Sequence, residues 1–168
     1  MKVSIITVCF NSEKTIEDTL KSVASQTYPN IEYIVVDGLS SDNTNDIVKK
    51  YSNIVSTYIS EKDDGLYDAM NKGIKLATGD VVGIINSDDV FASKDSIAQL
   101  VAGFTSDSIG AVYSDLVYVS GKNLKKITRL YSSKVFRKQL IKFGIMLPHP
   151  TFYAKKELYT KYGLYKTN

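Results

Sequence analysis

The chain has 168 residues, which suits one domain with a sizeable core. A hydrophobic content of 43% and a charged content of 23% are ordinary for a globular protein, and no apolar run approaches the roughly 20 residues that span a bilayer. The lone Cys9 excludes an internal disulfide, and the opening stretch MKVSIITVCFNSEKT lacks a signal-peptide cleavage site, so we expect a cytoplasmic protein.

The net charge of +3 is unevenly distributed along the chain. Residues 1–120 hold 9 Lys/Arg and 17 Asp/Glu, a net charge of −8, whereas residues 121–168 hold 12 Lys/Arg and a single acid, Glu157, a net charge of +11. Such a division indicates two faces with different partners. The basic part suits an anionic membrane surface or a phosphorylated ligand, and a solvated basic face is the alternative.

The first 90 residues alternate between strand-like and helix-like patterns. Apolar runs predict buried strands at 3–8, 31–37, 54–60 and 80–86. Between them we expect a helix from about Ser12, a short helix that includes Ile47 and Tyr51, and a helix from Leu66 to Ala77. Strands joined by single helices imply right-handed crossovers and a mainly parallel α/β sheet flanked by helices.

Ligands of such sheets bind at the carboxyl ends of the strands. This rule places Phe10–Asn11, Asp37 and Asn86–Asp89 together on one edge of the predicted sheet. Asp88 and Asp89 are adjacent acids that repel each other, and a divalent cation would offset the repulsion. Mg²⁺ takes one or two carboxylates and completes its shell with water and phosphate oxygens. The alternative is that both acids cap the following helix.

The second half of the chain has weaker patterns. We expect a helix at about 95–104, a strand-like segment at 110–121 and a hairpin partner in NLKKITRLY, which spans 123–131. Residues 133–143 have the spacing of a basic amphipathic helix. Near the end of the chain, Glu157 lies on a predicted Lys-rich helix.

Several ordered motifs resemble the family-2 inverting glycosyltransferases, whose nucleotide-binding half has the GT-A fold. VSIITVCFN is similar to the family's opening strand, and IEYIVVDGLSSDNT to its second strand and acidic turn. The most specific piece is DDGLYDAMNKGIKLATGDVVGIINSDD, which ends in an acidic motif similar to the family's metal motif. The resemblance covers the whole chain and implies a single GT-A domain, residues 1–168.

The resemblance also implies roles for individual residues. Val8, Phe10 and Asn11 correspond to the edge that holds the uracil, and Asp37 to the carboxylate that accepts from the uracil N–H. Asp88 corresponds to the direct metal ligand. The remaining matches are Asn71 and Lys72 beside the ribose and sugar, Asn86 toward the ribose, Asp89 as an orienting acid, and His149 near the diphosphate or acceptor. Gly38 departs from the pattern, because a second acid often follows Asp37 there.

Inverting sugar transfer needs a general base that deprotonates the attacking hydroxyl. In the resembled family this base is an Asp downstream of the His segment, whereas here the tail from Pro148 to Asn168 offers only Glu157. We therefore expect a chain cut short of its catalytic base and acceptor region. A natural donor-binding remnant is the alternative.

The resemblance thus implies an inverting glycosyltransferase domain that uses a nucleotide-diphosphate sugar, with UDP as the nucleotide and Mn²⁺ or Mg²⁺ at Asp88. Its acceptor would be a saccharide or lipid-linked acceptor in bacterial surface polysaccharide synthesis, with peripheral contact at the inner face of an anionic membrane. A non-catalytic nucleotide-sugar-binding module is the main rival. A nucleotidyltransferase is disfavoured, because CFNSEKT contains no Gly-rich phosphate loop after the first strand. No role in nucleic-acid binding is expected.

Overall fold

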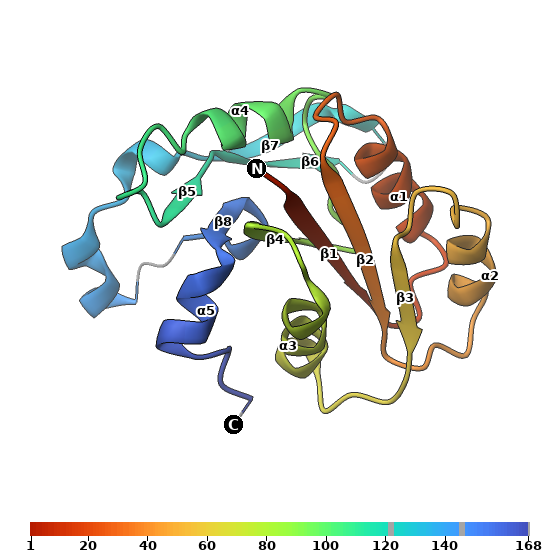
Figure 1. Cartoon of the computed structure of the whole chain (residues 1–168). Coiled ribbons are helices and arrows are strands. Elements are labelled where there is room, and N and C mark those ends of the chain that lie inside the picture. The colour runs from red at the N-terminus through yellow and green to blue at the C-terminus, as the bar shows by residue number, and fades with distance from the viewer. Residues whose placement is uncertain (121–122, 145–146, 168) are drawn as a thin grey trace.

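A six-stranded sheet forms the centre of the protein, in a computed structural model that describes residues 1–120, 123–144 and 147–167 (Figure 1). The strand order is β3-β2-β1-β4-β8-β5. Its parallel part contains β1 (Val3–Cys9), β2 (Ile31–Asp37), β3 (Thr57–Ser60) and β4 (Val81–Asn86). On the other side of β4, β8 (Phe152–Lys155) runs antiparallel to both β4 and β5 (Ala111–Tyr113).

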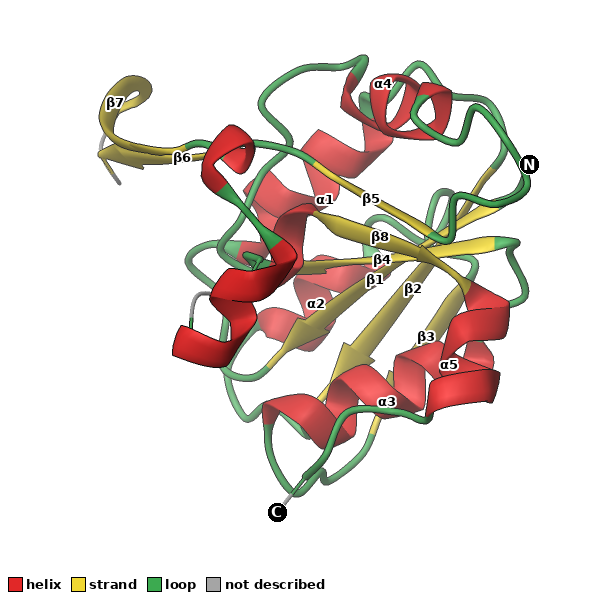
Figure 2. Ribbon diagram, turned by 90° about the vertical axis from the view of Figure 1, so that its left-hand side faces the viewer, coloured by secondary structure: helices red, strands yellow, loops and turns green. Residues whose placement is uncertain are grey.

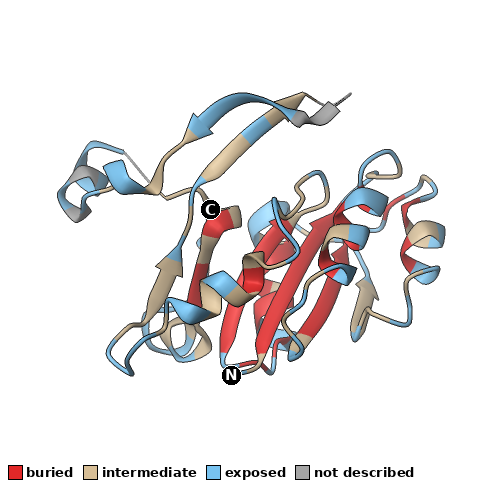
Figure 3. Ribbon diagram, turned by 90° about the horizontal axis from the view of Figure 1, so that it is seen from above, coloured by how far each residue is buried: buried red, intermediate tan, exposed pale blue. Residues whose placement is uncertain are grey.

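Helices cover both faces of this sheet (Figure 2). The helices are α1 (Ile16–Ala24), α2 (Thr44–Lys49), α3 (Leu66–Leu76), α4 (Ser96–Ala102) and α5 (Lys156–Tyr162). Alternate residues of β1 point to opposite faces: Val3 and Ile5 pack in one core with residues of α1, α2 and α4, whereas Ile6 and Val8 pack in the other core against α3. Figure 3 shows that β1, β2 and β4 are buried along most of their length, and burial on both faces explains their long apolar runs. The edge strand β3 is only partly buried.

The predicted α/β architecture is confirmed, and its element bounds need small corrections. The third strand spans Thr57–Ser60 rather than 54–60, because Ile54 and Val55 belong to a turn in which both amides donate to the Tyr51 carbonyl. The first helix begins at Ile16 rather than near Ser12, whose carbonyl accepts from the Thr15 and Ile16 amides in a preceding turn.

The predicted strand at 110–121 is two strands that belong to different sheets. After β5 the chain turns at Asp115 and continues as β6 (Leu116–Ser120), while Gly121 lies outside the described residues. β6 pairs antiparallel with β7 (Asn123–Tyr131), so the predicted hairpin partner is confirmed. The Asp115 carboxylate fixes the turn, because it accepts hydrogen bonds from the Ser133 amide (2.7 Å) and hydroxyl (2.6 Å).

The prediction of an amphipathic helix at 133–143 is wrong. Its place is taken by two short 3₁₀ segments, Ser133–Val135 and Lys138–Phe143, separated by the extended backbone of Phe136. A helix draws most of its stability from packing an apolar face, but Val135 and Phe143 remain 62% and 79% exposed here. No helix among the described residues is long and apolar enough to cross a membrane.

β8 is the one strand of the main sheet that the sequence pattern does not indicate. Its four residues are too few for a clear period, yet they occupy an interior position in the sheet. The fully buried ring of Tyr153 lies over Gly83 of β4, where an added Cβ would come within 2.0 Å of the ring. Gly83 was the available signal, since a glycine inside an apolar strand often marks the close approach of another group.

Candidate active site

The carboxyl ends of β1, β2 and β4 meet at one edge of the sheet, as predicted. In the strand register Cys9 lies beside Asp37, and Val8 beside Asn86. A cleft of about 880 Å³ opens at this edge, and its lining includes Val8, Phe10, Asn11, Asn86 and Asp88. Five of the predicted site residues are therefore brought together by the fold.

The loops after β1 and β2 hold each other in place at the edge of the cleft. Asn11 has a positive φ of 49°, a conformation that Asn tolerates better than most residues. Its amide donates to the Ser40 hydroxyl (2.8 Å), and its side-chain oxygen accepts from the Ser41 amide (2.9 Å). Nearby, the Ser12 amide donates to the Thr44 hydroxyl (2.7 Å). Hydrogen bonds between the two loops thus shape this side of the cleft.

Phe10 presents its ring to solvent at the cleft. The residue is 63% exposed although it follows a completely buried strand, so it does not contribute to the core. Val8, two residues earlier in the chain, is buried and lines the cleft. An exposed aromatic ring over an apolar floor provides a stacking surface for a planar ligand.

Asp37 is fully buried and does not line the cleft. One carboxylate oxygen accepts from the Ser40 hydroxyl and, more weakly, from the Cys9 thiol (3.6 Å). The other accepts from the Ser40 amide (2.9 Å) and the Ser60 hydroxyl (2.6 Å). These four donors fill the acceptor capacity of a carboxylate. A direct contact between Asp37 and a base N–H would require one of them to be displaced.

Asp88 and Asp89 differ in their surroundings. Asp88 is exposed, lines the cleft and has no hydrogen-bond partner among the described residues, whereas Asp89 is half-buried. Burial raises the pKa of Asp89, and the adjacent Asp88 carboxylate raises it further, while the Asn86 amide (3.0 Å) and His149 oppose the shift. Asp89 thus supports the strand end, and Asp88 is the acid available to a ligand.

His149 approaches this acid pair from a distant part of the sequence. Its Nε2 lies 3.3 Å from Asn86 Nδ2, and burial lowers the pKa of the imidazole, with Asp89 opposing. The side-chain oxygen of Asn86 is buried and has no hydrogen-bond partner among the described residues. A buried acceptor without a partner is unfavourable, and a ligand hydroxyl would satisfy it once neighbouring groups moved aside.

Asn71 and Lys72 have structural partners away from the cleft. The Asn71 side chain exchanges two hydrogen bonds of 2.9 Å with the backbone of Tyr165. Lys72 Nζ donates to the Lys62 carbonyl (2.7 Å) and pairs with Glu61 (2.9 Å), which raises the pKa of the lysine. These residues secure the C-terminal segment and the loop before α3, and neither is part of the cleft lining.

The cleft contains further charged residues that sequence reasoning did not single out as site residues. Glu13, Asp42 and Asp63 line it together with Asp88, whereas Lys14 is the only cation in the lining given by the described residues. These residues lie in loops, where no period indicates which side chains face inward. An anionic ligand entering such an acidic cleft would be repelled unless a cation accompanied it.

The residues at β4 fit a divalent metal that also needs ligands from its substrate. No group of three or more His, Cys, Asp or Glu side chains among the described residues is arranged to enclose a metal ion. Asp88 instead offers a single exposed carboxylate beside a second acid. This arrangement matches the preference of Mg²⁺, and of other hard cations, for one or two carboxylates plus phosphate oxygens and water.

Comparisons with known proteins agree with this geometry. The sequence model described as glycosyl transferase family 2 matches residues 4–163. TuaG of Bacillus subtilis, named for a glycosyltransferase role in teichuronic acid biosynthesis, is 39% identical over 90 residues, which are 52% of this chain and 36% of TuaG. The chain spans less than two thirds of the length of the curated relatives that it matches.

Two solved structures share the fold. A mannosyltransferase from Pyrobaculum calidifontis, in complex with GDP-Man and Mn²⁺, superposes with a TM-score of 0.78 at 24% identity, covering 99% of this chain and 48% of the other. Staphylococcus aureus TarS, in complex with UDP-GlcNAc, superposes with a TM-score of 0.76 at 25% identity, covering 96% and 47%. Together with the family match over nearly the whole chain, these findings show that the chain belongs to glycosyl transferase family 2 and has the GT-A fold.

Proposed function

We propose that this domain binds a nucleotide-diphosphate sugar, with UDP as the nucleotide, and serves in the inverting transfer of the sugar to an acceptor. The observation that carries the proposal is the pairing, in one cleft, of the exposed Phe10 ring with the unpartnered Asp88 carboxylate. The ring suits a base, and the carboxylate suits a metal-bound diphosphate. TarS, of the same fold, is in complex with UDP-GlcNAc.

A divalent cation, Mn²⁺ or Mg²⁺, is part of this proposal, with Asp88 as its protein ligand. The acidic lining of the cleft supports it, because Lys14 is the one cation that the described residues contribute to the lining to offset the charge of a diphosphate. The bound cation would neutralise the charge that builds on the leaving nucleotide diphosphate. The mannosyltransferase of the same fold is in complex with Mn²⁺.

The chain's own side chains would position the rest of the donor. The unpaired oxygen of Asn86 would accept a hydrogen bond from a ribose hydroxyl, as its neutral side chain in place of an acid permits. His149, whose Nε2 lies 3.3 Å from Asn86 Nδ2, would act beside the diphosphate or the acceptor. Asp89 would keep Asn86 oriented through its 3.0 Å hydrogen bond.

The general base is expected outside these 168 residues. Glu157 lies at the opposite edge of the sheet from the cleft, since the neighbouring Lys156 amide donates to the Asp80 carbonyl (2.9 Å) at the start of β4. A six-residue strand separates the two edges by roughly 15–20 Å, far beyond hydrogen-bond reach of an acceptor in the cleft. The same observation keeps a non-catalytic donor-binding module as the second candidate, and sugar transfer by the full-length protein would exclude it.

The metal hypothesis is tested by measuring UDP affinity calorimetrically in Mn²⁺ and in EDTA. We expect binding at least about tenfold weaker in EDTA, because Asp88 then faces the diphosphate unscreened. Asp88→Ala should abolish the difference while leaving the melting temperature unchanged, since an exposed strand-end acid contributes little to packing.

A matched control is Asp46→Ala, which removes an exposed acid of α2 that does not line the cleft. It should retain the full metal dependence. Equal UDP affinity of the unmodified chain in Mn²⁺ and EDTA would contradict the metal assignment, and no binding of any nucleotide diphosphate would contradict the proposed function itself.

A further inference from the structure

Asp63 is a carboxylate of the cleft to which the motifs assign no role. It lies in the loop between β3 and α3 and lines the cleft together with Phe10. One of its oxygens, Oδ1, accepts a hydrogen bond from the Gly65 amide (2.9 Å). The other, Oδ2, has no hydrogen-bond donor among the described residues, so Asp63 is anchored at one oxygen and free at the other.

The free oxygen occupies the space above Gly38. A Cβ added to Gly38 would lie 2.5 Å from Asp63 Oδ2 and 3.4 Å from Cδ2 of the Phe10 ring. Such a side chain would collide with Asp63 unless the carboxylate shifted, so the glycine at residue 38 leaves room for the carboxylate in this position. Asp63 Oδ2 and Cδ2 of the Phe10 ring thus both lie close to the same point above Gly38, which makes the two side chains neighbours in the cleft lining.

The loop that carries Asp63 is held from several directions. Lys72 Nζ binds the Lys62 carbonyl (2.7 Å) and the Glu61 carboxylate (2.9 Å), both just before Asp63. Just after it, the Asp64 amide donates to the Asp68 carboxylate (3.2 Å). Asp63 is therefore preorganised before any ligand arrives, which reduces the entropy lost on binding.

Asp37, by contrast, has no acceptor capacity to spare, because donors from Ser40, Ser60 and Cys9 surround its carboxylate. Of Asp37 and Asp63, only Asp63 lines the cleft and has a carboxylate oxygen without a donor among the described residues. Acceptance of a hydrogen bond from the base N–H, the role expected for Asp37, would fall to Asp63 instead. Asp63 is 26 positions later in the chain and is brought near Asp37 by the pairing of β2 with β3.

We propose that Asp63 determines which nucleobase the cleft accepts. The inference rests on the proposed function and adds a selecting residue to it. A base stacked on Phe10 would present its edge to Asp63 Oδ2, which only accepts hydrogen bonds. Uracil, thymine and guanine carry a ring N–H at that edge. Cytosine and adenine carry an unprotonated ring nitrogen, which the carboxylate repels.

The test is a calorimetric panel of UDP, dTDP, GDP, CDP and ADP in Mn²⁺ with the 168-residue chain. The unmodified chain should bind at least one of UDP, dTDP and GDP about tenfold or more tightly than CDP and ADP. This ratio of affinities is the margin that the variants test. Asp63→Asn should remove that margin or reverse it toward CDP. In this variant the amide oxygen keeps the Gly65 contact and turns the NH₂ group, a donor, toward the base.

Asp64→Asn is the matched control, since it makes the same chemical change at an exposed neighbour that does not line the cleft. It should keep the original margin. Asp63→Ala, with its fold verified by thermal melting, should also lose the margin. Because Asp63→Ala removes the carboxylate without introducing an NH₂ donor, it shows whether loss of the acceptor alone abolishes the margin.

Moving the carboxylate provides an independent check. Gly38→Asp alone should weaken binding of the preferred nucleotide, because its side chain collides with Asp63 and adds a like charge. Combined with Asp63→Gly it should recover most of the affinity and the margin, a non-additive result that separate structural defects would not produce.

Three results would overturn the inference while leaving the proposed function intact. They are equal affinity of the unmodified chain for all five nucleotides, an unchanged margin in Asp63→Asn, and additive losses in the double variant. If the unmodified chain binds none of the nucleotides, the proposed function fails, and the inference fails with it.

Discussion

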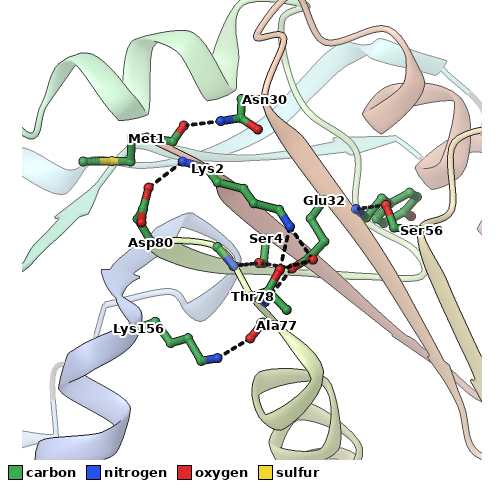
Figure 4. Close-up of polar contacts among 12 residues, drawn as sticks. Met1, Lys2, Ser4, Asn30, Glu32, Ser56, Ala77, Thr78, Asp80 and Lys156 are labelled. Carbon is green, nitrogen blue, oxygen red and sulfur yellow. Dashed lines mark hydrogen bonds and ion pairs between the residues drawn. The ribbon is translucent and has the colours of Figure 1, made fainter.

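Glu32 is the centre of a polar network at the edge of the sheet opposite the cleft (Figure 4). Its carboxylate accepts from Lys2 Nζ (2.7 Å), the Ser4 hydroxyl (2.5 Å), and both the amide (2.7 Å) and hydroxyl (2.5 Å) of Thr78. These contacts join β1, β2 and the turn before β4. The network therefore fixes the strand register from which the cleft residues emerge at the other end.

We expect this network to make stability depend on acidity. Burial opposes ionisation of Glu32, but the hydrogen bonds from Lys2, Ser4 and Thr78 outweigh it and lower its pKa from 4.5 to about 2. A lowered pKa in the folded state means that the stabilisation is complete above pH 4.5 and is lost as pH falls toward 2. The shift corresponds to about 3 kcal/mol of unfolding free energy.

The measurement is urea denaturation of the unmodified chain and of Glu32→Gln between pH 2 and 7. The variant should be less stable by about 3 kcal/mol at pH 7, and the difference should shrink below pH 4.5. Glu17→Gln, at a half-exposed surface pair with Lys21, should have little effect. A difference between Glu32→Gln and the unmodified chain that stays constant down to pH 2 would contradict the assignment.

At the scale of elements, α3 packs against β1 through Gly73. The helix packs its buried face, including Met70 and Ile74, on the sheet. A Cβ at Gly73 would come within 2.4 Å of Ile6 Cγ2. The glycine therefore sets the distance of the helix from the sheet, and with it the position of Leu66 and Ala69, which line the cleft.

Gly73→Ala tests this packing through the sign of its effect. Helix propensity alone predicts that alanine stabilises by about 1 kcal/mol. We expect instead that the free energy of unfolding, measured by chemical denaturation, falls by roughly 1–3 kcal/mol, because the added methyl overpacks the core. In an Ile6→Ala background, which removes the colliding atom, the loss should diminish or change sign. Stabilisation by Gly73→Ala alone would show that α3 has room to shift.

At the scale of the whole molecule, the charges separate into an acidic cleft and a basic projection. β5 runs parallel to β4, so β6 departs from the same edge of the sheet at which Asn86 meets the cleft. Figure 2 shows the β6–β7 hairpin projecting beyond the main sheet. Its exposed apolar residues, Ile127 and Leu130, alternate with Lys126 and Arg129, and residues 116–156 contain no acid.

We expect from this combination that the hairpin binds an anionic membrane surface. In sedimentation with vesicles, the chain should bind those containing anionic lipid, bind neutral vesicles much less, and dissociate as salt increases. Lys126→Glu with Arg129→Glu should reduce binding by tenfold or more. The control, Lys49→Glu with Lys50→Glu on the α2 side, has the same net charge change and should reduce it far less. Equal reduction by both pairs would contradict a specific contact.

The sequence by itself determined the α/β class, the order of the parallel strands and helices along the chain, and the edge of the sheet at which the cleft lies. These features follow from local patterns: continuous apolar runs, helical spacing, and the rule that carboxyl ends of parallel strands share an edge. The motifs then indicated the family, and Val8, Phe10, Asn11, Asn86 and Asp88 do line one cleft.

Only the tertiary structure decided which polar groups are free to meet a ligand. Asp37 ends its strand as predicted, yet hydrogen bonds from Ser40 and Ser60 already engage its carboxylate. Asp63 lines the cleft instead, in space that Gly38 leaves open. The insertion of β8 and the separation of β6 and β7 from the main sheet are likewise long-range pairings. Local spacing cannot encode them, since hydrogen-bond saturation and strand neighbours depend on segments that meet only when the chain folds.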